Sequence, residues 1–100
     1  MKDMKDILYF SRHDDKKIGH TSQNHEHNIK FYSEEIKLNP ENSDAYFNRG
    51  NAYVRLKNYE QAITDYSEVI RLNPDNEKAY YNRGTAYVRL KNYEQAITDY

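Results

Sequence analysis

A stretch of 22 residues occurs twice in this chain with almost the same sequence. Residues 45–66 read AYFNRGNAYVRLKNYEQAITDY and residues 79–100 read AYYNRGTAYVRLKNYEQAITDY, an offset of thirty-four positions. Only two positions differ, with Tyr81 in place of Phe47 and Thr85 in place of Asn51. A fixed period of this length is typical of helical arrays in which each repeat packs only against its neighbours. Such arrays are usually binding surfaces, so the period predicts a binding protein.

Each copy has the residue spacing of two short helices joined by a turn. Apolar and small residues recur every three or four positions, which predicts helices over about residues 44–56 and 59–72. Pro74 ends the second helix because proline has no amide hydrogen for the next turn, and the following helix is expected near residue 77 or 78. Gly50 allows two helix backbones to approach. A larger side chain there is expected to overpack the crossing and to lower the stability by roughly 1–3 kcal/mol.

The same period organises the rest of the chain. Residues 28–42 align with residues 62–76, which predicts that they hold the second helix of a first repeat. Residues 43–76 are then one complete repeat, and residues 77–100 are a truncated one.

Residues 1–27 lack the signature and are expected to be a degenerate or capping half-repeat, or a linker. Helical spacing predicts a short amphipathic helix over about residues 3–12. Gly19 then begins the polar stretch HTSQNHEH, which has no periodicity and is interpreted as a linker or an irregular turn.

All four histidines lie in this N-terminal part, close to several carboxylates. Imidazole and carboxylate groups together could bind a divalent metal. No pair has a spacing of four residues on a clearly predicted helix, so a solvated linker is the favoured interpretation of His13, His20, His25 and His27.

Composition and charge exclude several classes of function. The formal net charge is −1, with 15 basic and 16 acidic residues, so no long-range attraction to nucleic acid or to an anionic membrane is expected. The apolar patch at residues 7–10 is too short and its surroundings are too charged for a signal peptide or a membrane span. With no cysteine in the chain, a cytoplasmic protein is expected.

The chain also offers little that could carry catalysis. Its three glycines are far apart, so there is no glycine-rich phosphate loop, and no histidine lies in the clear repeats. The carboxylates that recur with the period are interpreted as surface charge: Glu60, Asp65, Glu94 and Asp99. We therefore expect no enzyme and no bound cofactor or metal.

The large and small residues of each copy follow one pattern, which in the complete copy consists of Tyr46, Arg49, Gly50, Tyr53, Ala62, Tyr66 and Pro74. This pattern resembles the signature of the tetratricopeptide repeat family. Arg49 and Arg83 stand where the family usually has leucine, and Val69 where a small residue is common, as is frequent in bacterial members. The resemblance covers residues 28–100 well and implies an all-α, right-handed superhelical solenoid of antiparallel helix pairs.

The last predicted helix has only eight residues before the sequence stops at Tyr100, whereas its counterpart continues. Because an isolated helix of this length is marginal in water, the chain is interpreted as a fragment of a longer array. A natural end at Tyr100 would instead expose an apolar flank that could drive self-association through the terminal helix.

The resemblance implies a concave groove lined mainly by the first helix of each repeat. Residues there that packing does not need form the candidate partner-binding site: Phe47, Asn48, Asn51, Arg55, Lys78, Tyr81, Asn82, Thr85 and Arg89. Asn48 and Asn82 resemble the asparagine ladder of O-GlcNAc transferases, in which each amide holds the backbone of an extended peptide. One amide offers both a donor and an acceptor to a peptide unit. The alternative is that both are polar surface or assist a helix–helix contact.

A second family pattern is the clamp with which chaperone-binding tetratricopeptide domains hold a C-terminal carboxylate. The resemblance implies lysine at the place of Phe47, and lysine and arginine on neighbouring repeats. Phe47 and Tyr81 occupy the lysine position, Asn82 stands where the arginine would be, and only Lys78 matches. Chaperone tails are therefore not expected as partners.

The predicted function is a protein–protein interaction scaffold that binds an extended peptide or a partner protein in the groove. Two alternatives remain open: a structural spacer or self-assembly element of a larger multidomain protein, and a regulatory array attached to an enzyme outside this sequence. The two differences between the copies, at Phe47 and Asn51, both fall on the predicted groove and favour binding.

Overall fold

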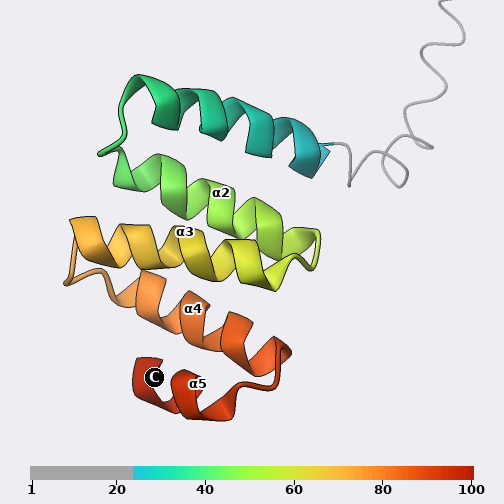
Figure 1. Cartoon of the computed structure of the whole chain (residues 1–100), viewed down its shortest axis with the longest axis vertical. Helices are drawn as coiled ribbons and strands as arrows, with labels where there is room; N and C mark the ends of the chain where they lie inside the picture. Colours follow the sequence, from blue (N-terminus) through green and yellow to red (C-terminus); the bar gives the residue numbers. More distant parts are fainter. Residues whose placement is uncertain (1–23) are drawn as a thin grey trace, which may run out of the picture.

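In the computed structural model, residues 24–100 are described, and this part of the chain is entirely helical apart from short turns. A helix over residues 24–38 is followed by four more: α2 (Ser43–Arg55), α3 (Tyr59–Leu72), α4 (Glu77–Arg89) and α5 (Tyr93–Asp99). Each helix runs back along the one before it, so the helices form a single row (Figure 1). The predicted all-α solenoid of antiparallel helix pairs is confirmed.

Local chemistry sets the ends of these helices. The side chain of an asparagine accepts a hydrogen bond from the amide three residues later at the start of each labelled helix, at Asn42, Asn58, Asn76 and Asn92. Such caps satisfy amides that lack an intrahelical partner. At the end of α2, Lys57 adopts a left-handed conformation with φ 62°. Its amide donates to the Val54 carbonyl and the Asn58 amide donates to the Tyr53 carbonyl, both at 2.8 Å, which closes a Schellman turn.

The helix boundaries agree closely with the spacing of apolar residues, with one exception. Helices α2 and α3 lie within one residue of their predicted ranges, and α4 begins at Glu77 as expected. The first helix begins at residue 24, so the prediction of a linker is wrong for residues 24–27. Those four positions read NHEH and have no apolar residue to reveal a helical period. The helix predicted over residues 3–12 lies outside the described residues.

Small side chains allow the helices to pack closely. The buried positions include six alanines: Ala45, Ala52, Ala62, Ala79, Ala86 and Ala96. A Cβ atom added at Gly50 would lie 2.9 Å from Cε1 of Tyr66, a ring that is only 1% exposed. The glycine is therefore needed because α3 places an aromatic ring directly against the backbone of α2.

An ion pair between a half-buried arginine and a buried aspartate joins α2 to α3. Arg49 Nε and Nη2 donate to the two carboxylate oxygens of Asp65, each at 2.8 Å. Arg49 Nη1 donates to Ser33 Oγ at 3.0 Å, so the same side chain also reaches the preceding helix. The rings of Tyr46 and Tyr53 lie beside the guanidinium, at 5.8 Å and 5.9 Å from its carbon to their centroids.

The same arrangement recurs one period later. Arg83 makes two 2.8 Å hydrogen bonds to Asp99 and one of 3.0 Å to Ser67. The interpretation of Asp65 and Asp99 as surface charge is therefore wrong, because they are only 1% and 8% exposed. Burial raises the pKa of the Asp65 carboxyl, and the hydrogen bond to Asp65 raises the pKa of Arg49.

Within residues 24–100, no helix has the length and apolar character needed to cross a lipid bilayer. In the same part of the chain, no three His, Asp or Glu side chains gather where they could hold a metal ion. Of the four histidines, His13 and His20 lie outside the described residues.

Candidate functional site

Polar side chains form matching stripes on α2 and α4. Asn48, Asn51 and Arg55 are three and four residues apart on α2, and their counterparts on α4 are Asn82, Thr85 and Arg89. Residues at this spacing lie on one face of a helix. The stripe on α2 is distinct from the stripe of Tyr46, Arg49 and Tyr53 that packs around the buried ion pair.

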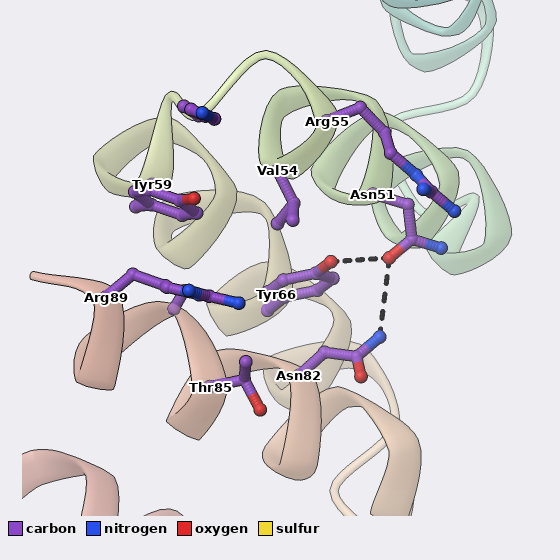
Figure 2. Close-up of a pocket in the computed structure, with 10 residues that line it drawn as sticks. Asn51, Val54, Arg55, Tyr59, Tyr66, Asn82, Thr85 and Arg89 are labelled. Carbon is purple, nitrogen blue, oxygen red and sulfur yellow. Dashed lines mark hydrogen bonds between the residues drawn. The ribbon is translucent and has the colours of Figure 1, made fainter.

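The two polar stripes meet at a cavity of about 540 Å³ between α2, α3 and α4, called the main cavity below (Figure 2). Five of the predicted site residues line it: Asn51, Arg55, Asn82, Thr85 and Arg89. The remaining lining residues were not predicted for the site: Val54, Lys57, Tyr59, Tyr66 and Ala86.

One amide oxygen connects all three helices at the main cavity. Oδ1 of Asn51 accepts a hydrogen bond from the Tyr66 hydroxyl and a second, at 3.4 Å, from Nδ2 of Asn82 (Figure 2). Burial raises the pKa of Tyr66 to about 12, against the opposite effects of the Asn82 amide and the charge of Arg55. At neutral pH the Tyr66 hydroxyl is therefore a neutral donor.

A smaller hollow of about 210 Å³ lies on the other side of Asn51, between α2 and the helix over residues 24–38. Asn51 and Arg55 line both this second hollow and the main cavity. Asn48, which is exposed, lines the second hollow together with Asn28 and His25. The two hollows therefore adjoin each other at the polar stripe of α2 and are together called the groove.

The structure separates the other predicted site residues from this groove. The Phe47 ring packs against Tyr66, with 5.8 Å between the ring centroids. Tyr81 is 63% exposed and lines a different hollow, of about 320 Å³, together with Tyr100. Lys78 is exposed in the first turn of α4.

Tyr66 is expected from the sequence to serve only in packing, but it also lines the main cavity. Its ring fills the contact at Gly50, while its hydroxyl reaches the polar groups of the main cavity. Tyrosine combines an apolar ring with a polar tip, and this was the available signal for a dual role. Lys57 lies in the turn after α2, and its side chain lines the main cavity although the helical spacing gives no signal for it.

Comparison with known proteins places this geometry among related structures. A model described as TPR repeat matches residues 50–91, and one described as Tetratricopeptide repeat matches residues 31–64. The Arabidopsis OM64 TPR domain is 34% identical with a TM-score of 0.74, and the alignment covers 86% of this chain and 69% of that one. No curated protein matches the chain.

Two further solved structures are similar. The second TPR of Spaghetti (RPAP3), bound to the HSP90 peptide SRMEEVD, is 30% identical with a TM-score of 0.74, and the alignment covers 85% of this chain and 80% of that one. The MamA protein is 28% identical with a TM-score of 0.70 over 71% of this chain, which spans only 39% of MamA. With its repeated helix pairs, the two matching repeat models and a 34% identical domain that it covers to 69%, the chain belongs to the tetratricopeptide repeat family.

Proposed function

We propose that this chain is an interaction scaffold that holds an extended segment of a partner protein in the groove formed by the main cavity and the second hollow. The observation that carries the proposal is the line of amide groups along this groove. Asn48 and Asn51 on α2 and Asn82 on α4 all line one of the two hollows. An amide can donate to a peptide carbonyl and accept from a peptide N–H, whatever side chains the peptide carries. The oxygen of Asn51 already accepts two hydrogen bonds, so this residue offers its NH2 group as a donor.

Two further properties of the groove favour a segment of chain over a compact small ligand. The main cavity and the second hollow share Asn51 and Arg55, so a ligand that fills both must cross this pair. An extended peptide spans about 3.3 Å per residue and can follow such a path. The Asn51 amide is already oriented by hydrogen bonds to Tyr66 and Asn82, which reduces the entropy lost when a ligand binds.

The related RPAP3 domain, whose structure contains an HSP90 peptide, supports a peptide as the class of ligand. The chemistry of the partner is expected to differ here, because Phe47 and Tyr81 occupy the positions where the carboxylate clamp has lysine. We therefore propose an internal segment of a partner, and the prediction that chaperone tails do not bind remains to be tested.

The test is selection from a random library of nine-residue peptides that are displayed within a loop, so that they have no free ends. The full chain is expected to enrich a set of peptides, and the double substitution Asn51→Ala and Asn82→Ala should weaken their binding by about tenfold. The matched control is Gln61→Ala with Gln95→Ala, which removes two exposed amides at equivalent positions of α3 and α5. Failure to recover any peptide, or an equal loss in the control, would contradict the proposed function.

A further inference from the structure

The charged side chains that line the main cavity are all positive. They are Arg55 from α2, Lys57 from the turn and Arg89 from α4, and no aspartate or glutamate lines either the main cavity or the second hollow. Within residues 24–100, none of the three cations forms an ion pair with a carboxylate. The formal net charge of the whole chain is −1, so this local excess does not follow from composition.

The same helices also carry two arginines whose role is structural, and these differ from the arginines at the cavity. Arg49 on α2 and Arg83 on α4 are held in the core by bidentate hydrogen bonds to a buried aspartate. Arg55 and Arg89 lie six residues further along, are exposed and have no such partner among the described residues. A guanidinium presents a planar fork of donors that matches a carboxylate, so these two side chains retain their capacity to bind one.

The positions of the cations concentrate the positive charge on the cavity. Figure 2 shows the Arg89 side chain extended towards Tyr66, and Arg55 beside Asn51 on the other side of the cavity. Lys57 is held at the same cavity by a left-handed backbone, a conformation in which glycine is the favoured residue. A glycine there would relieve the backbone but remove the charge. The charge of Arg55 also lowers the pKa of Tyr66 against the larger effect of burial, so it acts on the cavity interior.

We propose that the main cavity binds an acidic side chain, aspartate or glutamate, from within the partner segment. Its carboxylate is bound by Arg55 and Arg89, with Lys57 as a third cation, while Asn51 and Asn82 contact the main chain of the segment. The second hollow adjoins the main cavity at Asn51 and Arg55, so a segment that occupies both passes beyond the main cavity, and its carboxylate then comes from a side chain, not from a chain end. This inference rests on the proposed function and adds the chemistry of the ligand.

The loop-displayed peptide library tests this inference, because none of its peptides has a free C-terminus. Peptides selected by the full chain should contain aspartate or glutamate at one position several times more often than the input library. Replacing that residue by asparagine or glutamine in a synthetic peptide blocked at both ends should weaken binding at least about tenfold. Binding of the acidic peptide should also weaken as salt is added.

Substitutions in the chain identify the side chains that bind the carboxylate. The double substitution Arg55→Ala and Arg89→Ala should abolish the acidic enrichment and reduce the affinity for the acidic peptide to that of its amide version. The control Lys37→Ala with Arg71→Ala also removes two exposed positive charges, both outside the groove, and should keep the enrichment.

Three outcomes would overturn the inference. Selected peptides without acidic enrichment would leave the peptide scaffold standing but refute the carboxylate site. An equal loss in the Lys37/Arg71 control would attribute the preference to overall charge. A parallel library with free C-termini is the third arm, and acidic peptides that bind only there would assign the site to a terminal carboxylate.

Discussion

The two repeats of this chain have nearly the same sequence but different polar contacts at one position. In the inner repeat, residues 43–76, Asn51 Oδ1 accepts from Tyr66 of its own repeat and from Asn82 of the next. In the outer repeat, residues 77–100, Thr85 Oγ1 donates to the carbonyl of Tyr81 at 3.0 Å and lies 2.9 Å from the Tyr100 hydroxyl. In both repeats the side chain at this position contacts the tyrosine of its own repeat. The position that would match Asn82 for Thr85 is 116, outside the 100 residues of this sequence.

The contacts of the ion pairs, in contrast, are the same in both repeats. Each arginine has two 2.8 Å hydrogen bonds to an aspartate of its own repeat and one of 3.0 Å to a serine of the preceding helix. The comparison therefore separates a duplicated contact that holds the helices together from a contact that differs and lies at the groove. The ion pairs should govern the stability of the folded chain, and the contacts of Asn51 should mainly govern coupling between the repeats.

The largest effect should come from breaking the duplicated contact. Asp65→Ala leaves the Arg49 guanidinium without its carboxylate, and removal of one partner from a buried pair typically costs about 3–5 kcal/mol. Urea denaturation followed by circular dichroism measures the loss. The repeat-matched variant Asp99→Ala should cost less, because Asp99 is more exposed and α5 is shorter.

Two further variants test whether the loss comes from an uncompensated charge. Glu60→Ala removes an exposed carboxylate of the same helix and should change stability by less than about 0.5 kcal/mol. Arg49→Leu combined with Asp65→Leu removes both charges and should recover most of the stability. If Asp65→Ala were no worse than Glu60→Ala, the ion pair would not stabilise the inner repeat.

The second effect concerns the glycines that face an aromatic ring in each repeat. Gly50→Ala places a Cβ atom 2.9 Å from a fully buried Tyr66 ring, so we expect a loss of roughly 1–3 kcal/mol. Gly84→Ala meets Tyr100 at 2.7 Å, but that ring is 59% exposed and can move away. Thermal unfolding should therefore show a larger destabilisation for Gly50→Ala, and equal losses would show that exposure of the ring does not matter.

These results also explain how much of the molecule the sequence could predict. The helices follow from local signals, namely the apolar spacing and Pro74, and the period placed their boundaries within one residue for α2 and α3. The burial of Asp65 could not be predicted from its own neighbourhood, because its partner Arg49 is sixteen residues away. One signal was present: an arginine at a position where the family usually has leucine needs a buried anion nearby.

The groove was predictable only in part for the same reason. The stripe of Asn51 and Arg55 follows from helical spacing, and the structure brings both to the main cavity. The contacts of Asn51 join residues fifteen and thirty-one positions away, and they depend on how far neighbouring helices are displaced. Helical spacing also could not show that Phe47 packs against a ring while Arg55 faces the groove.

A third effect depends on pH and on the buried hydroxyl of the inner repeat. Tyr66 has a pKa of about 12 in the folded chain, and an unfolded tyrosine titrates near about 10. Between these values the unfolded chain loses this proton and the folded chain keeps it, so stability falls as pH rises. The contribution of Tyr66 should fall by about 1 kcal/mol between pH 9 and pH 11. Urea midpoints at both pH values measure it, and Tyr66→Phe should reduce the fall, whereas Tyr93→Phe at an exposed ring should not.

The smallest effect should come from exchanging the residue that distinguishes the repeats. Asn51→Thr gives the inner repeat the hydroxyl of the outer one, so Tyr66 keeps a local partner as Tyr100 does with Thr85, and only Asn82 loses its acceptor. The expected loss is below about 1 kcal/mol, because the lost bond is long and half-buried. A double-mutant cycle with Asn82→Ala measures the coupling directly. Coupling between positions 51 and 82 should be present with asparagine and absent with threonine, and coupling that survived the exchange would show that the repeats communicate through packing alone.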